Sequence, residues 1–109
     1  MDLTQKKCVP CEGGTPPLAA EEARTLLQQV KGWELTAVNS VQTVEKKFKF
    51  KDFGEAMEFV NKVVELAEKE GHHPDITINW NKVVLQLSTH AIKGLSENDF
   101  IMAAKIDRL

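Results

Sequence analysis

Residues 75–88, DITINWNKVVLQLS, decide the fold because they read as a β-hairpin. Apolar and polar side chains alternate on both sides of a short break, which is typical of two strands that each bury one face. The dipeptide Asn81-Lys82 suits a two-residue turn, although Lys is a poorer second residue than Gly. This turn places Trp80 opposite Val83. The apolar side chains of both strands, including the Trp80 ring, then fall on the face that we expect to enter the core.

A long amphipathic helix precedes the hairpin. It should begin at Asp52 and run to about Glu70, because Glu55 completes a pair that resembles a capping box and Gly71 suits a left-handed stop. Its apolar stripe is broader than a helix that only covers a sheet needs. The surplus predicts that another subunit covers part of this helix, giving a homodimer or homotetramer. The stripe comprises Phe53, Ala56, Met57, Phe59, Val60, Val63, Val64, Leu66 and Ala67.

The remaining elements follow from the same periodicities. We expect a helix at residues 19–31, strands at 33–37 and 44–50, and a final helix from about 100 to 106. Ser96 precedes the final helix, and Asp99 stands three residues later as in a capping box. The order is helix, strand, strand, helix, strand, strand, helix. It predicts an α+β fold, with a four-stranded antiparallel sheet and three helices on one of its faces.

Size and composition place the chain among ordinary globular domains. It has 109 residues and a formal net charge of −2, with 42% hydrophobic and 28% charged side chains. We expect a flexible leader at residues 1–17 and a single domain at 18–109. The longest apolar run has five residues, at 100–104, which is too short to cross a membrane. There is no basic block for nucleic acid and no apolar segment behind the first lysines, so we expect a cytoplasmic protein.

The two cysteines stand together as Cys8-Val9-Pro10-Cys11 in the polar leader. A closed zinc site needs four ligands, and the sequence holds no second pair of this kind. A redox pair of the thioredoxin type should follow a strand and open a helix, which this pair does not. The favoured interpretation is therefore a reduced pair in a cytoplasmic tail. A metal shared between subunits and redox sensing stay open as alternatives.

The three histidines of the chain should come together. The hairpin pairing, continued past the strand ends, places His73 opposite His90, with the two Cβ atoms ~5 Å apart. His72 is the neighbour of His73, directly after the long helix. Pro74 has no N–H and can end the ladder early. We expect all three imidazoles at the open end of the hairpin, beside the C-terminus of that helix.

Such a cluster has two chemical uses. Imidazole, with a pKa of ~6.5, gives and takes protons near neutrality, and it is also a common metal ligand. Adjacent histidines on an extended chain point in different directions, which favours proton transfer over a shared metal ion. Glu68 and Asp99 are candidates to orient the imidazoles or to balance their charge. The simpler interpretations are a solvated helix residue for Glu68 and a capping residue for Asp99.

These residues resemble the signature of the pterin-4a-carbinolamine dehydratases. In order and spacing, the signature matches Glu68, the run His72-His73-Pro74, Trp80, His90 and Asp99. Flanking phrases are similar as well, namely FKFKDF at 48–53, NKV at 81–83, STH at 88–90 and GLS at 94–96. The resemblance covers residues 18–107, and the leader with its two cysteines looks like that of bacterial members.

The resemblance implies that the chain removes water from 4a-hydroxytetrahydropterin to give quinonoid dihydropterin, with no metal and no organic cofactor. This reaction restores the pterin cofactor of aromatic amino-acid hydroxylases, to which the protein would be functionally coupled. The implied catalytic residues are His72, His73 and His90. We expect His73 and His90 to transfer protons and His72 to orient the substrate or act as a second acid. The residues expected to contact the pterin are Glu68, Gly71, His72, His73, Ser88, Thr89, His90 and Asp99.

Two positions depart from the family pattern, and two other functions stay open. Gly71 stands where animal members carry Asp, and Trp80 replaces a common Tyr, for which a place in the core is the simpler expectation. Some animal relatives also bind a dimeric homeodomain transcription factor through the helix surface with which they self-associate, so the chain could be a protein-interaction module. The three histidines could alternatively form the zinc shell of a hydrolase.

Overall fold

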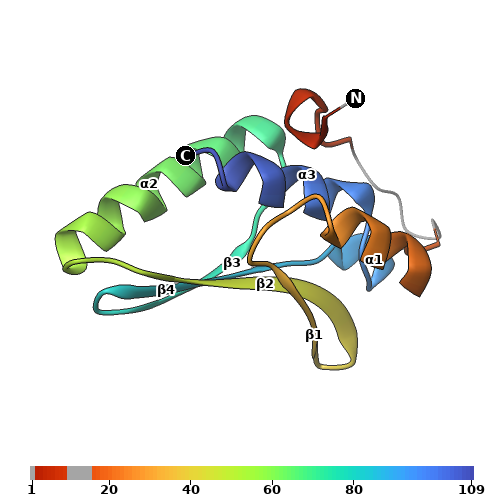
Figure 1. Cartoon of the computed structure of the whole chain (residues 1–109), viewed down its shortest axis with the longest axis horizontal. Coiled ribbons are helices and arrows are strands. Elements are labelled where there is room, and N and C mark those ends of the chain that lie inside the picture. Colours follow the sequence, from red (N-terminus) through yellow and green to blue (C-terminus); the bar gives the residue numbers. More distant parts are fainter. Residues whose placement is uncertain (1, 10–15) are drawn as a thin grey trace.

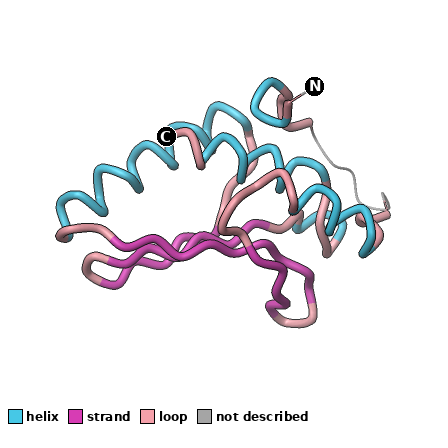
Figure 2. The backbone as a smooth tube through the Cα atoms, in the orientation of Figure 1, coloured by secondary structure: helices cyan, strands magenta, loops and turns pink. Residues whose placement is uncertain are grey.

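The computed structural model describes residues 2–9 and 16–109. Its four strands form one antiparallel sheet in the order β1-β2-β4-β3, and the helices lie on one face of that sheet (Figures 1 and 2). The predicted α+β fold is thereby confirmed. The elements are η1 (Leu3–Gln5), α1 (Ala20–Leu27), β1 (Glu34–Val38), β2 (Val41–Lys49), α2 (Phe53–Glu70), β3 (Asp75–Asn79), β4 (Lys82–Leu87), η2 (His90–Ile92) and α3 (Glu97–Ile106).

The α2 helix begins and ends where its capping residues predict. Asp52 is the N-cap, and its Oδ1 accepts a hydrogen bond from the Glu55 N–H at 2.8 Å. Gly71 closes the helix with a φ of 69°, a conformation that costs glycine little because it has no Cβ. The chain therefore leaves α2 in a fixed direction, and this direction places the next two residues, both histidines.

The apolar stripe of α2 divides between the core and the surface. Four residues of the stripe are buried within the chain, namely Ala56, Val60, Val63 and Ala67. Phe53 and Val64 keep 49% and 45% of their surface exposed. The apolar surface of α2 that this chain does not cover is therefore smaller than the stripe predicts. It consists of these two large residues and the half-buried ones beside them.

The predicted register of the β3–β4 hairpin is wrong by two residues. The turn residues are Trp80 and Asn81, so Ile78 rather than Trp80 lies opposite Val83. Asn81 explains the shift, because its side-chain amide donates to the Phe50 carbonyl at 2.9 Å while its own carbonyl accepts from the Phe50 N–H at 2.8 Å. These bonds draw Asn81 toward the end of β2. A shift of two residues leaves every side chain on its predicted face. Trp80, however, occupies the turn with a φ of 54° and is 63% exposed, so it is not a core residue.

The first half of the chain shows smaller differences. The α1 helix ends at Leu27, four residues before the predicted end, because the N–H groups of Gln29 and Val30 bond to carbonyls only three residues back. This tighter turn carries Val30 into the core. The β1 and β2 strands are joined by Asn39 and Ser40, with φ values of 52° and 67°, as in the tight turns typical of hairpins.

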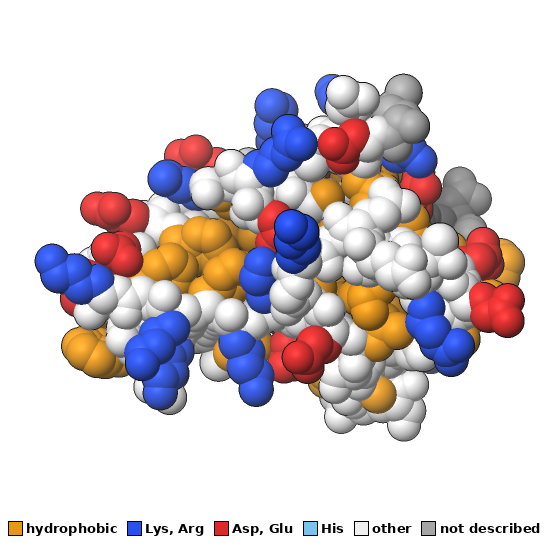
Figure 3. Space-filling model, in the orientation of Figure 1, with side chains coloured by type: hydrophobic (Ala, Val, Ile, Leu, Met, Phe, Trp, Pro, Cys, Tyr) orange, Lys and Arg blue, Asp and Glu red, His pale blue; other side chains and the backbone are white. Residues whose placement is uncertain are grey.

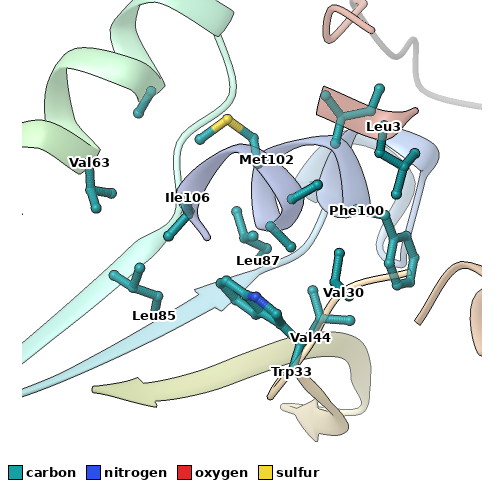
Figure 4. Packing of buried hydrophobic residues seen from close by; sticks show 14 of the residues in the cluster. Leu3, Val30, Trp33, Val44, Val63, Leu85, Leu87, Phe100, Met102 and Ile106 are labelled. Atoms are coloured by element: carbon teal, nitrogen blue, oxygen red, sulfur yellow. The ribbon is translucent and has the colours of Figure 1, made fainter. Parts of the chain in front are cut away.

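The core lies between the sheet and the helices, around α3 (Figure 4). Phe100, Met102 and Ile106 of α3 pack with Leu85 and Leu87 of β4, and all five are buried. Because α3 is buried along most of its length, its N-terminal turn is held in a fixed position. That turn carries Asp99.

Lys46 is the one charged residue of β2 on the core side, and its position has a physical explanation. Its Nζ donates to Asp107 Oδ1 at 2.8 Å and to the Lys31 carbonyl at 3.0 Å. The same nitrogen lies 5.1 Å from the centre of the Phe48 ring. Trp33 Nε1 donates to the same Asp107 oxygen at 3.0 Å. The lysine is therefore satisfied where the sheet meets the end of α3.

The described part of the predicted leader packs against the domain. Leu3, in η1, is 3% exposed and belongs to the core cluster around α3. Lys6 forms an ion pair with Glu97, at 3.0 Å, and Cys8 donates its backbone N–H to Glu70. These contacts differ from the expected leader with little structure, because residues 2–9 lie along α3 and the end of α2.

The surface carries mixed charge. Basic and acidic side chains alternate on the face shown in Figure 3, with apolar side chains visible between them. Within residues 2–9 and 16–109, no helix is long and apolar enough to cross a bilayer.

Candidate active site

A pocket of about 340 Å³ opens where α2 and β4 end. Two short segments supply most of its wall, one directly after α2 and the other directly after β4. All three histidines of the chain reach it from these segments. The residues of the two segments that line the pocket are Gly71, His72, His73, Ser88, Thr89 and His90. Six of the eight residues predicted to contact the substrate therefore line one cavity.

His72 is held by Asp99 from behind the pocket. Its Nε2 lies 2.6 Å from Oδ1 of Asp99, a residue with 0% exposed surface. An ionised carboxylate can only accept hydrogen bonds, so this contact assigns the proton to Nε2 of the ring. The other ring nitrogen, Nδ1, is then the one left for a ligand.

Asp99 is in turn held by two further groups through its second oxygen. Oδ2 accepts from the Ser96 N–H at 2.9 Å and from the Thr89 hydroxyl at 3.0 Å. The Thr89 and Ser96 hydroxyl oxygens are 2.7 Å apart, so Thr89 can accept from Ser96 while it donates to Asp99. Asp99 thus caps α3 and binds a histidine at the same time. Asp99 is therefore both a capping residue and the partner of an imidazole, the two interpretations that the sequence leaves open for it.

His73 has a weaker and more exposed partner. Its Nε2 lies 2.6 Å from Oε2 of Glu68, which is in the last turn of α2. The two side chains are 61% and 71% exposed, so water screens their attraction. Glu68 can bias the orientation of the His73 ring, but it does not fix that ring as Asp99 fixes His72.

His90 differs from the other two histidines. It is the first residue of η2, and its backbone carbonyl accepts from the Lys93 N–H at 3.2 Å. Across the described ranges, its ring makes no hydrogen bond and no ion pair. Both of its ring nitrogens are therefore available to a bound molecule.

The predicted pairing of His73 with His90 across the hairpin is wrong. The β3–β4 ladder ends at Asp75 opposite Gln86, and His90 lies beyond the strand in a 3-10 turn. The two histidines meet at the pocket because the chain leaves α2 and β4 at the same end of the molecule. All three histidines line one pocket, but the reason differs from the one that the register predicts.

Three residues that line the pocket were not predicted. Ala91 follows His90, and Asn98 precedes Asp99 in the first turn of α3. Val9 comes from the N-terminal segment, which no periodicity connects with the histidines. The position of Asn98 beside Asp99 is a usable signal, because both lie in the same helical turn. Nothing in the sequence points to Val9.

The cysteine pair can be judged only at its first residue. Burial, followed by the nearby Glu70 carboxylate, raises the pKa of the Cys8 thiol to about 12. Cys11 lies outside the described residues. Among the side chains that are described, no group of three or more His, Cys, Asp and Glu residues is arranged to hold a metal ion.

Comparison with known families gives the same family that the motifs suggest. The model of the family described as "Pterin 4 alpha carbinolamine dehydratase" matches residues 16–109. The chain belongs to this family. The match includes both segments that line the pocket and the turn of α3 that carries Asp99.

Relatives from bacteria extend the match to nearly the whole chain. A Methylococcus capsulatus protein is 53% identical over 107 residues, which cover 98% of this chain and 92% of the relative. A Rubrobacter xylanophilus protein is 47% identical over 108 residues, which cover 99% of this chain and 98% of the relative. Both carry the name "Putative pterin-4-alpha-carbinolamine dehydratase".

Solved structures share the fold. A crystal structure described as a transcriptional coactivator/pterin dehydratase from Brucella melitensis has a TM-score of 0.77 and 34% identity, covering 84% of this chain and 96% of that one. A pterin dehydratase-like protein described as a RuBisCO assembly factor in the alpha-carboxysome has a TM-score of 0.60, and the alignment covers 71% of this chain and 87% of that one. The identity with the second is 23%, so that likeness concerns the fold alone.

Proposed function

We propose that this protein is a 4a-hydroxytetrahydrobiopterin dehydratase, a hydro-lyase that works by histidine acid–base catalysis. The observation that carries the proposal is the arrangement of three imidazoles around one pocket, with two of them bonded to carboxylates. Imidazole is the side chain best suited to move protons near neutral pH. Membership of the family supplies the substrate class.

The reaction needs one proton delivered and one removed. Hydroxide is a poor leaving group, so the C4a–OH bond breaks only when an acid protonates its oxygen and water departs. The lone pair of the adjacent ring nitrogen then forms the new double bond to C4a, and that nitrogen gives up its proton to a base. Each such positioned step typically contributes ~10²–10⁴-fold to the rate.

The contacts of the histidines suggest how the roles divide. His73 and His90 are the more exposed pair, and we assign the two proton transfers to them, on the two sides of C4a. His72 presents Nδ1 from a ring that Asp99 holds in place. In the neutral ring this nitrogen accepts a hydrogen bond and would orient the pterin, whereas in the imidazolium it donates and would serve as a second acid. Gly71 and Ser88 bring backbone groups to the same pocket and would bond the edge of the pterin ring.

The proposed setting is the cytoplasm, where an aromatic amino-acid hydroxylase would supply the substrate and reuse the recycled cofactor. We further propose a homodimer or homotetramer, with α2 in the interface. The exposed side chains Phe53 and Val64 support this, because large apolar groups on a helix gain from burial.

The decisive experiment measures dehydration of freshly generated 4a-hydroxytetrahydrobiopterin. Native protein, His90→Ala and native protein with a chelator are compared with the spontaneous reaction. We expect fast, chelator-resistant turnover that collapses in His90→Ala. Loss of activity with the chelator would support the metal hydrolase instead. No acceleration by native protein would contradict the proposal.

A binding module is the second candidate. The exposed apolar residues of α2 favour it, and the Brucella melitensis relative is described as a transcriptional coactivator as well as a dehydratase. Val64→Glu and His90→Ala separate the two functions. For an enzyme that self-associates through α2, Val64→Glu should reduce the oligomer in sedimentation and retain pocket chemistry, while His90→Ala should do the reverse. Assembly without any turnover in the native protein would favour the binding module.

A further inference from the structure

The N-terminal segment forms part of the wall of the histidine pocket. Val9 lines the pocket together with His72, His73 and His90, although more than 60 residues separate it from them in sequence. Its side chain is 62% exposed, so it meets the solvent at the mouth of the pocket rather than the core. An apolar side chain at this place offers the pterin ring a non-polar surface, whereas the histidines offer hydrogen-bonding groups.

Asn98 fixes the backbone of Val9 in two directions. Its Oδ1 accepts from the Val9 N–H at 3.0 Å, and its Nδ2 donates to the Val9 carbonyl at 2.5 Å. Asn98 is buried and lies next to Asp99 in the first turn of α3. The first turn of α3 therefore holds Val9 through Asn98 and His72 through Asp99.

The rest of the segment is attached along α3. The Cys8 N–H donates to Glu70 Oε1 at 3.0 Å, and Glu70 is itself paired with Lys105 at 3.0 Å. Leu3 is buried in the core cluster at the far end of the segment. Leu3 and Cys8 therefore attach the segment on both sides of residues 4–7. These attachments keep Val9 beside the pocket.

We propose that residues 2–9 are a fixed wall of the pterin site and that Val9 contacts the bound pterin and limits which pterins fit. This inference rests on the proposed function, because it takes the pocket to be the pterin site. The match to the family model begins at residue 16 of this chain, whereas the Methylococcus capsulatus relative matches 98% of the chain. The wall therefore lies outside the part of the chain that defines the family, and it adds to a site that the family core already forms.

Direct binding of 7,8-dihydrobiopterin tests the wall without requiring turnover. The dissociation constant is measured by fluorescence quenching for the native protein, Val9→Trp and Thr36→Trp. Val and Thr have the same shape, and Thr36 is exposed on β1 and lines none of the pocket, so the second variant controls for the added indole. We expect Val9→Trp to weaken binding by ~10-fold or more, and Thr36→Trp to stay within ~2-fold of native.

A second variant tests the anchoring from a distance. Leu3→Ala removes buried apolar contacts without touching the pocket, and it should loosen the segment. We expect faster amide hydrogen exchange at residues 4–9 and binding of 7,8-dihydrobiopterin weakened several-fold, while the exchange of β4 amides stays slow. Slow β4 exchange shows that the domain is still folded.

The outcomes separate the two proposals. If the native protein binds 7,8-dihydrobiopterin and both Val9→Trp and Leu3→Ala bind it equally well, the wall is wrong and the proposed function stands. If the native protein neither binds 7,8-dihydrobiopterin nor accelerates the dehydration, the proposed function fails and the wall fails with it. Rapid exchange of residues 4–9 in the native protein would also overturn the fixed wall, whatever the pterin does.

Discussion

Nε2 of His72 lies 2.6 Å from Oδ1 of Asp99, and Asp99 has no exposed surface. A buried, ionised carboxylate is stable only when its lone pairs are used, and this one accepts from His72, Ser96 and Thr89. The result is a histidine whose tautomer is set from behind the pocket. The protonation of the other ring nitrogen, Nδ1, therefore depends on a residue that does not line the pocket.

Asp99→Asn should therefore damage the proposed reaction more than it damages the fold. The amide keeps the shape of the carboxylate, but it can place an N–H against His72 and reverse the tautomer. We expect kcat to fall by ~10²-fold, because a His72 ring in the wrong tautomer would hold the pterin in a less productive position. Steady-state dehydration kinetics measure the fall, and ¹⁵N chemical shifts of the His72 ring report the tautomer.

Glu34→Gln is the control for that variant. It removes the same charge from an exposed carboxylate at the start of β1, and Glu34 does not line the histidine pocket. Its kcat should stay within ~2-fold of native, since exposed charges act weakly through water. An Asp99→Asn protein with native kcat and a native His72 spectrum would contradict the role given to Asp99.

Thr89 should act through Asp99 rather than through the substrate. Its hydroxyl donates to Asp99 Oδ2 at 3.0 Å, and its side chain is buried. Thr89→Val keeps the volume but leaves the carboxylate with one donor fewer, which should lower the free energy of unfolding by about 1–3 kcal/mol. The ring of His72 should become more mobile, and kcat should fall more than the affinity for the pterin.

Urea unfolding, kinetics and the His72 spectrum test this prediction together. Thr89→Ser keeps the hydroxyl and should restore most of the loss. Thr43→Val is the control, because Thr43 is also buried but donates to the Val41 carbonyl within β2. If Thr89→Ser behaves like Thr89→Val, the hydroxyl is not what matters at this position.

Short-range patterns in the sequence predict most of the fold. The capping pair at Asp52, the stop at Gly71 and the Ser96–Asp99 box each act within one helical turn, so a single sequence carries all the information that they need. The alternation in β3 and β4 likewise assigns each side chain to a face. The histidine neighbourhood follows from these elements, since Gly71 and the end of β4 direct the chain to the same place.

Contacts between distant segments explain what the sequence could not predict. Asn81 moves the hairpin turn through bonds to Phe50, 31 residues away. No property of residues 80–82 alone reveals that partner. Val9 and Leu3 reach α3 through contacts that depend on the finished surface of the domain. The composition of the leader, which is polar and rich in glycine and proline, does not predict such docking, because the docking residues are few and have no periodicity.

The attachment of the N-terminal segment should weaken in acid through Glu70. Burial of Glu70 acts to raise its pKa, but hydrogen bonds from the Cys8 N–H and from Lys105 outweigh burial, and the pKa lies below its usual 4.5. Because the unfolded chain then binds the proton more readily, this group stabilises the folded state above about pH 4.5, and its contribution is lost as the pH falls through the lower folded pKa.

Urea unfolding of native protein and Glu70→Gln at several pH values measures this contribution. We expect the native protein to be more stable by about 1–3 kcal/mol at pH 7. The difference should shrink as the pH falls below 4.5, where the native carboxylate becomes protonated as well. Glu58→Gln, at an exposed position of α2, should show no such convergence. A difference that stays constant with pH would mean that the charge of Glu70 does not hold the segment.

The Cys8 thiol should be slow to react while the segment is docked. Burial and the neighbouring Glu70 raise its pKa from the usual 9.0 to about 12. At pH 8 the thiolate, which is the reactive form, is therefore scarcer by roughly two to three orders of magnitude.

In a Cys11→Ser protein, Cys8 alone reports on the reaction with a disulfide reagent. We expect a slow reaction in buffer and a fast one in urea, where the thiol regains its ordinary pKa. Leu3→Ala, added to the Cys11→Ser protein to loosen the segment, should react at an intermediate rate. Fast reaction of the Cys11→Ser protein in buffer would show that residues 2–9 leave α3 readily, and it would argue against the docked segment from an observation independent of pterin binding.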